Sequence, residues 1–305
     1  MSEPDVKPRL PDFLIIGAMK GGSTTLHAYL LRHPDVFLAR PKEPQFFSRD
    51  AVYARGLAWY ASLFETAAPG QLCGEASTCY SRWPHFGDVP ARIFEALPAV
   101  KLVYQLRHPV ERAYSHYLHL MQERQIRGEE PVYAFHRAVE SYPEILDASL
   151  YVDQIRQFER FYPATRIHLL TLDDLRTDPR QSLLELQEFL GLRALDLTTQ
   201  GPVSANVWGD RLARNRMRSR LQRLGALPGA PLVARLLPPS WRRRAKRALR
   251  RPGVARRVES RALREHRAVL PPMSQTTRAE LLERFRRSTD ELESRLGRAL
   301  PEWHA

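Results

Sequence analysis

The amino-acid sequence predicts an α/β fold of three layers, in which helices cover both faces of a central parallel sheet. Three apolar runs, at residues 13–16, 101–106 and 166–172, have the length and composition of buried parallel strands. Segments with helical spacing separate these runs, and strands that alternate with helices favour a parallel sheet. With 305 residues and 43% hydrophobic content, the chain is long enough to bury a sizeable core.

The first apolar run leads into a glycine-rich turn and then into a helix. Gly17, Gly21 and Gly22 allow a tight turn whose backbone N–H groups face inward, and residues 23–31 supply N-cap hydroxyls and helical spacing. Unpaired N–H groups and the helix dipole both attract an anion, so this segment predicts a phosphate cradle and a P-loop-like fold. A plain strand-to-helix turn that uses glycine only for its geometry is the alternative.

The position of the lysine distinguishes this loop from the loop of ATP- or GTP-binding proteins. The pattern of those proteins, G-x-x-x-x-G-K-[ST], places lysine directly after the second glycine, where this chain has Ser23. The lysine of this loop is Lys20, at the tip of the turn. The loop is therefore predicted to bind a phosphate-like group other than an ordinary triphosphate.

After the first helix, a short strand over residues 36–39 leads into an extended polar loop. Pro41 and Pro44 prevent a helix over residues 40–47, and the two aromatic residues that end this loop are expected to anchor it to the core. Glu43, held between the prolines, is a candidate for a positioned carboxylate that accepts a proton. A solvated surface charge is the alternative.

The strand-like run at residues 101–106 ends at Arg107. In open α/β sheets, ligands gather beyond the carboxyl ends of the strands, where Arg107 and the first loop would both lie. Ser115 follows eight residues later, two turns into the next predicted helix, and an arginine fork with a hydroxyl suits a terminal phosphate. An arginine that caps a carbonyl and a serine that faces solvent are the alternative.

The remaining segments complete the alternation of strands and helices. Asp178 is a predicted N-cap before Pro179, Gly191 ends that helix, and Ser274 is the predicted N-cap of the last helix. The two aspartates before Leu175 are expected to form a turn. Helices are predicted over 52–64, 89–97, 132–139, 149–161, 182–190 and 276–296, and a strand that runs into a polar loop over 71–80.

The positive charge of the chain is concentrated in one segment. The net charge is +13, but residues 211–267 alone carry 19 Lys and Arg against two acids. Such a segment can contact an anionic membrane or a polyanion, and a solvated arginine-rich face is the alternative. We expect one domain over residues 1–305, with disorder over 1–9, a basic, mostly helical insertion over 198–267, and a C-terminal helix over 268–305 that returns to the core.

Targeting signals are weak in this sequence. The N-terminal residues 1–9 have no apolar h-region, so a secretory signal is not expected, and the apolar runs are far shorter than the ~20 residues that span a bilayer. Cys73 and Cys79 form neither a disulfide framework nor a metal-like spacing with histidine. The sequence therefore predicts a cytoplasmic protein, with peripheral contact to a membrane through residues 211–267 left open.

Taken together, three of these segments resemble the sulfotransferases that use 3′-phosphoadenosine 5′-phosphosulfate (PAPS). Residues 11–26 (PDFLIIGAMKGGSTTL) resemble the family's 5′-phosphosulfate loop, and residues 106–115 (LRHPVERAYS) resemble its 3′-phosphate motif. Residues 42–47 (KEPQFF) are similar to the loop that carries the catalytic glutamate of the heparan-sulfate-type branch and its bacterial relatives. The C-terminal PPMS, helix and LPEW also resemble the family's ending.

The resemblance implies transfer of a sulfuryl group from PAPS to a hydroxyl or amine of a carbohydrate, lipid or small metabolite, without a metal. Glu43 would take the acceptor's proton, and Lys20 would neutralise the leaving phosphate. Glu75 and His85 are further candidates for the base, Tyr151 is a candidate for contact with adenine, and no specific nucleic-acid binding is expected. The implied cofactor-binding residues are Lys20, Gly21, Gly22, Ser23, Thr24, Thr25, Arg107, Ser115 and Arg267.

Arg267 stands where the heparan-sulfate enzymes carry a cofactor loop rich in Lys, Gly and Arg, which this chain lacks. Two other functions were weighed. A P-loop kinase for a small metabolite is disfavoured by Ser23 and by the lack of an evident magnesium-binding aspartate after a strand. A non-enzymatic protein that binds membranes or nucleic acids through its arginine-rich segment would leave Lys20 and Arg107 without a role.

Overall fold

The computed structural model describes residues 9–132, 134–201 and 273–305. The chain divides into two compact units; residues 121–132 are the described part of the second unit, and every other described residue belongs to the first. From residue 202 onward the predicted basic insertion lies outside the described residues, as do Arg267 and the first eight residues. The prediction of one domain for the whole chain stays a prediction.

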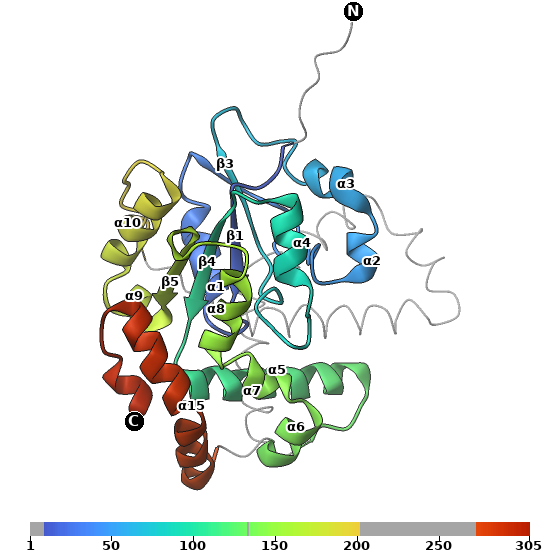
Figure 1. Cartoon of the computed structure of the whole chain (residues 1–305), viewed down its shortest axis with the longest axis vertical. Helices are drawn as coiled ribbons and strands as arrows, with labels where there is room; N and C mark the ends of the chain where they lie inside the picture. Colours follow the sequence, from blue (N-terminus) through green and yellow to red (C-terminus); the bar gives the residue numbers. More distant parts are fainter. Residues whose placement is uncertain (1–8, 133, 202–272) are drawn as a thin grey trace, which may run out of the picture. The chain divides into compact units, whose positions relative to one another are not determined.

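The described residues of the first unit form a five-stranded sheet whose neighbouring strands are all parallel (Figure 1). The strands are β1 (Phe13–Gly17), β2 (Val36–Leu38), β3 (Leu72–Ala76), β4 (Lys101–Leu106) and β5 (Ile167–Thr171). Their order is β2-β3-β1-β4-β5, so β1 is central and its carboxyl end opens between β3 and β4. Helices flank this sheet, which confirms the predicted three-layer, P-loop-like class.

Eleven helices and two 3₁₀ turns lie in the described residues. They are α1 (Ser23–Leu30), α2 (Asp50–Tyr53), α3 (Gly56–Ser62), α4 (Val89–Ala96), α5 (Pro109–Arg127), α6 (Phe135–Ser141), α7 (Glu144–Asp147), α8 (Tyr151–Glu159), α9 (Leu172–Thr177), α10 (Pro179–Leu190) and α15 (Gln275–Leu296), with η1 (Ala164–Arg166) and η2 (Pro301–His304). None of the described helices combines the length and the apolar character that crossing a membrane requires.

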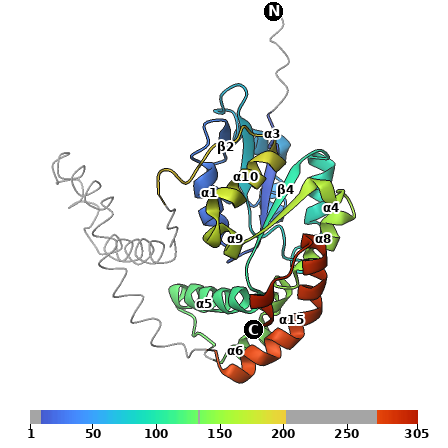
Figure 2. The same cartoon turned by 90° about the vertical axis from the view of Figure 1, so that its left-hand side faces the viewer.

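Alternate residues of the strands face two separate parts of the core. Phe13, Ile15 and Val103 pack with α1 and α10 on one face of the sheet. Leu14 and Leu102 pack on the other face with α3, α4, α8 and α15. Figure 2 shows α1 and α10 on one side of the sheet and α4, α8 and α15 on the other. Because both faces are buried, the strands read as continuous apolar runs, which explains why the sequence revealed them.

The predicted helix ends are largely confirmed. The Asp178 side chain accepts a hydrogen bond from the Gln181 N–H at the start of α10, and Gly191 ends this helix with a φ of 79°. Ser274 caps α15 by accepting from the Thr277 N–H. These signals are local in the sequence, because a cap bonds the backbone two or three residues away.

Two predicted segments differ from the structure. The predicted helix over 52–64 is broken into α2 and α3, and Gly56, the first residue of α3, has a φ of 81°, outside the helical region. The predicted turn before Leu175 is the helix α9, because Thr171 and Asp174 form a capping box that starts it.

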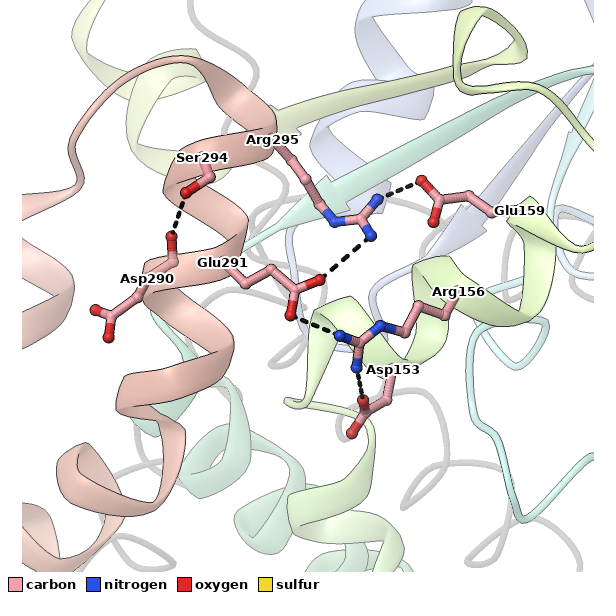
Figure 3. A network of polar contacts seen from close by, with 7 residues as sticks. All are labelled: Asp153, Arg156, Glu159, Asp290, Glu291, Ser294 and Arg295. Carbon is pink, nitrogen blue, oxygen red and sulfur yellow. Dashed lines mark hydrogen bonds and ion pairs between the residues drawn. The ribbon is translucent and has the colours of Figure 1, made fainter.

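Ion pairs join the C-terminal helix α15 to α8 (Figure 3). Glu291 accepts from Arg156 of α8 at 2.7 Å and lies 3.3 Å from Arg295, which also pairs with Glu159. Partly exposed ion pairs contribute little free energy each, so their main effect is to fix the position of α15 on α8. Beyond this helix, Trp303 is buried, and its Nε1 donates to Asp173 Oδ2 at 3.2 Å.

Candidate functional site

The glycine-rich loop leaves the carboxyl end of β1 and folds back on itself before α1. The Ala18 N–H donates to the Gln105 carbonyl of β4 at 2.6 Å, and the Gly21 N–H donates to the Ala18 carbonyl at 2.8 Å. Lys20, at the tip of this turn, has a left-handed φ of 69°. The loop is thus tied to β4, the strand that carries Arg107.

Two of its glycines are required by space. A Cβ on Gly21 would lie 2.6 Å from the Gln105 carbonyl oxygen, and a Cβ on Gly22 would lie 2.7 Å from Leu172 Cδ1. Gly22 also has a φ of 100°, which a side chain disfavours. Glycine at these positions lets the turn pack closely on β4 and α9, and a tight turn before a helix N-terminus fits a phosphate cradle.

The predicted N-cap role of the hydroxyl residues is wrong. Gly22 is the N-cap of α1, and no side chain caps this helix, because Ser23, Thr24 and Thr25 already form its first turn. The Thr25 and Leu26 N–H groups both bond the Gly22 carbonyl. The N–H groups before them lie at the positive end of the helix dipole, where a helix offers donors to an anion.

Arg107 reaches this loop from the end of β4. Its Nη1 lies 3.5 Å from the Lys20 carbonyl oxygen, and its Nη2 lies 3.6 Å from Glu111 Oε2. Burial lowers the pKa of Arg107, and the nearby Glu111 carboxylate opposes this. Tyr151, the candidate for adenine contact, is buried beneath it, and its hydroxyl donates to the Arg107 carbonyl at 2.5 Å, so it supports the arginine. Ser115 is half-buried on α5, and the side-chain hydrogen bonds of the described residues include none that joins it to Arg107.

The loop with Glu43 lies against the start of α1. Lys42 Nζ lies 3.2 Å from Thr24 Oγ1 and 3.3 Å from Glu43 Oε1, so this lysine links the carboxylate to the first helical turn. The Ala76 N–H donates to the Lys42 carbonyl at 3.3 Å, and the Gln45 N–H donates to Ser77 Oγ at 3.0 Å, which fastens the loop to the end of β3. No role of its own was predicted for Lys42, although its place next to Glu43 in the sequence was a signal for one.

The aromatic residues that end this loop anchor it as expected. Phe46 and Phe47 are buried, and Phe46 stacks on Tyr60 with ring centroids 4.5 Å apart. Arg267 lies outside the described residues, so its assignment to the cofactor site stays a prediction. His85, a further candidate for the base, is exposed and packs edge-on against Phe86.

Glu75, the other candidate for the base, is fully buried at the end of β3. It accepts hydrogen bonds from Tyr80 at 2.6 Å, Ser77 at 2.7 Å and Tyr60 at 3.2 Å. Burial raises the pKa of Glu75 to about 7, although these hydrogen bonds oppose the shift, and the charge of Glu43 raises it further. A carboxyl enclosed in this way does not contact a substrate directly.

We expect Glu75 to make the stability of the protein depend on pH. Its pKa is higher in the folded chain (about 7) than its usual value of 4.5, so its contribution is complete below pH 4.5 and is lost as the pH rises through 7. The loss amounts to about 3 kcal/mol. Urea unfolding at pH 5 and pH 8 should show this fall in the wild type and its absence in Glu75→Gln. An equal fall in both proteins would contradict the expectation.

The sequence of this chain is similar to the sequences of known sulfotransferases. The family model for the sulfotransferase domain matches residues 10–207. Heparan sulfate glucosamine 3-O-sulfotransferase 6 of Homo sapiens is 32% identical over 188 residues, which cover 61% of this chain and 53% of that protein. The bifunctional heparan sulfate N-deacetylase/N-sulfotransferase 3 of Homo sapiens is 30% identical over 205 residues, which cover 60% of this chain and 22% of that protein.

Similarity to a solved structure covers more of the chain. The crystal structure of a sulfotransferase from Alicyclobacillus acidocaldarius matches 97% of this chain and 100% of that one, with a TM-score of 0.63 and 21% identity. At this identity the likeness concerns the fold. The match to the curated 3-O-sulfotransferases is partial, since the aligned residues span about half of their length (53% and 55% in two of them).

Proposed function

Because this chain belongs to the sulfotransferase family, we propose that it transfers a sulfuryl group from PAPS to a hydroxyl or amine of a carbohydrate acceptor. The observation that carries the proposal is the meeting of three segments at one edge of the sheet. The loop after β1 is tied to β4, Arg107 reaches the tip of that loop, and Lys42 ties the loop with Glu43 to α1. A small-metabolite kinase and a non-enzymatic binding protein explain this arrangement less well.

In sulfuryl transfer, as in phosphoryl transfer, the protein contributes mainly by positioning the donor and the acceptor and by stabilising the charge that develops between them. In this proposal the N–H groups at the start of α1 hold the 5′-phosphate, and Lys20 neutralises charge on the leaving phosphate. Arg107, with Ser115, holds the 3′-phosphate that distinguishes this donor from ATP. The fit rests on the glycine turn, which packs so closely on Gln105 and Leu172 that a Cβ at Gly21 or Gly22 has no room, and on the arginine at its tip.

Glu43 is the proposed general base. Its side chain is 26% exposed, so an acceptor hydroxyl can approach it, whereas Glu75 is enclosed. The pairing with Lys42 holds the Glu43 carboxylate beside the first turn of α1, close to where the donor's phosphosulfate would bind. A positioned carboxylate of this kind takes the proton of the acceptor as the acceptor attacks sulfur.

The carbohydrate acceptor is inferred from relatives whose names place their activity on heparan sulfate glucosamine. The 19 Lys and Arg of residues 211–267 support an acceptor that is itself anionic or that lies at an anionic membrane surface. Transfer of labelled sulfate from PAPS to a panel of sulfated, carboxylated and neutral glycans would test this. A preference for neutral glycans would contradict an anionic acceptor.

Binding of the donor's product separates the proposed function from its alternatives. Isothermal calorimetry should show that adenosine 3′,5′-bisphosphate binds at least about 100-fold more tightly than ATP. Arg107 would contact the 3′-phosphate, which ATP lacks, and the loop has no lysine at the position that ATP-binding proteins use. Arg107→Gln should remove most of this difference. Equal binding of the two nucleotides by the wild type, or no binding of the bisphosphate, would overturn the sulfotransferase proposal.

A further inference from the structure

A second arginine lies behind the glycine-rich loop, within the segment 106–115 that resembles the 3′-phosphate motif, and the proposed chemistry gives it no role. Arg112, in the first turn of α5, is fully buried. We propose that Arg112 is a positioning residue that holds the tip of the loop, and that the anion bound in the loop is the counter-charge of its guanidinium. This inference rests on the proposed function.

The hydrogen-bond partners of Arg112 among the described residues are all uncharged groups. Its Nη1 donates to the Met19 carbonyl at 3.3 Å and lies 3.4 Å from His116 Nδ1. Its Nε donates to Ser149 Oγ at 2.5 Å, and its Nη2 donates to the Ile145 carbonyl. The guanidinium therefore connects the loop to α7 and to the short segment that follows it.

Two arginines hold two consecutive peptide units of the loop. Arg112 binds the carbonyl of Met19, and Arg107 lies beside the carbonyl of Lys20. The two differ in charge balance, because Glu111 lies beside Arg107, whereas no carboxylate in the described part of the chain forms an ion pair with Arg112. The peptide that Arg112 binds is the one that leads directly into Lys20.

The surroundings of Arg112 do not cancel its charge. Burial lowers the pKa of Arg112 to about 10, so the guanidinium stays protonated at neutral pH. Burial, and then the charge of Arg112, lower the pKa of His116 well below its usual value, so this imidazole is neutral. Arg82 and Arg107 are nearby cations. Asp147 is a nearby carboxyl whose pKa burial raises and Arg112 lowers, but it forms no ion pair with Arg112 in the described residues; Tyr104 and Tyr151 keep their protons because burial raises their pKa.

A buried cation without a counter-ion destabilises a fold, because water no longer solvates it. In the proposed function the phosphosulfate group in the loop supplies an anion, and Arg112 reaches that loop through its hydrogen bond to the Met19 carbonyl. The positive charge is then unfavourable in the free protein and favourable in the complex. Arg112 thus makes anion binding stronger at the expense of the stability of the ligand-free protein.

The test compares full-length variants by calorimetry and by thermal unfolding. Arg112→Met removes the charge, Arg112→Lys keeps it, and Ser149→Ala removes one hydrogen bond of the guanidinium without changing the charge. Arg112→Met should weaken binding of adenosine 3′,5′-bisphosphate on the order of tenfold or more. Arg112→Lys should recover most of that loss, and Ser149→Ala should lower Tm while leaving the affinity within about twofold.

A purely structural role predicts a different pattern. The proposal is overturned if Arg112→Lys and Ser149→Ala lose as much affinity for the bisphosphate as Arg112→Met does. It is also overturned if Arg112→Met binds the bisphosphate as tightly as the wild type. If Arg112→Met does not fold, Arg112→Lys decides the matter, since affinity close to that of the wild type supports the proposal and a tenfold loss contradicts it.

Inorganic pyrophosphate serves as a second probe, because it occupies the loop without needing Arg107 or an adenine site. A wild type that binds pyrophosphate in an Arg112-dependent way but not the bisphosphate would retain the role of Arg112 and refute the proposed donor. A wild type that binds neither anion would refute both proposals.

Discussion

Replacing Glu43 with glutamine is expected to lower kcat for sulfuryl transfer about a thousandfold, within the range lost when a general base is removed. The amide has the shape of the carboxylate but cannot take the acceptor's proton. The loop should keep its position, because its ties to β3 run through the Lys42 carbonyl and the Gln45 N–H rather than through the Glu43 side chain. Single-turnover transfer of labelled sulfate, with the best acceptor of the glycan panel, measures the effect.

Glu75→Gln is the matched control, since it changes the other carboxyl at this edge of the sheet. We expect its kcat to fall by less than about tenfold, because a buried group acts only through its neighbours. Bisphosphate affinity should be unchanged in Glu43→Gln, which separates chemistry from binding. A fully active Glu43→Gln would move the base elsewhere, and a kcat that rises through pH 7 and vanishes in Glu75→Gln would identify Glu75 as that base.

Lys20→Met should reduce transfer by several hundredfold, the scale seen when one preorganised charge or donor at a developing anion is removed. The methionine keeps the length of the side chain, so the change removes the ammonium that would neutralise the leaving phosphate. Lysine and methionine are both unbranched at Cβ, so methionine should tolerate the left-handed φ of 69° at this position as well as lysine does, and the loop should retain its path. The measurement is again single-turnover transfer at saturating PAPS.

Lys101→Met provides the matched control for this second experiment. Lys101 begins β4, at the opposite end of the strand from Arg107, and should not influence transfer. The loss in Lys20→Met should appear more in kcat than in bisphosphate affinity, because charge accumulates on the leaving phosphate as the bond to sulfur breaks. Transfer within threefold of the wild type would show that Lys20 does not act on the leaving group.

Several features of the candidate site depend on residues that are close together in the sequence, and these features were predicted from the sequence. Residues 13–16 are an unbroken apolar run, which suits a parallel strand that is covered on both faces. The glycines that follow them allow the tight turn that packs on β4 and α9. The capping of α10 by Asp178 is likewise local, since the cap and the N–H that it satisfies are three residues apart. Arg107 was placed near the loop because strands that are parallel end at the same edge.

Other features depend on segments that are distant in the sequence. That Lys42 meets Thr24, and that Glu75 is enclosed by Tyr60 and Tyr80, follows from how loops pack over the edge of the sheet. The N-cap of α1 is Gly22 because the turn of the loop imposes a left-handed φ there, which outweighs the usual preference for a hydroxyl residue.

The sequence by itself determined the layered α/β class and predicted a phosphate cradle with the candidate residues Lys20, Glu43 and Arg107, because the apolar pattern, the glycine spacing and the strand ends are short-range properties of the chain. Only the tertiary structure decided which charged groups lack water and which neighbours compensate them. The pKa of Glu75 and the burial of the Arg112 guanidinium, which forms no ion pair in the described residues, arise from several separate elements. Burial is a property of the assembled core, and the spacing of residues within one segment does not encode it.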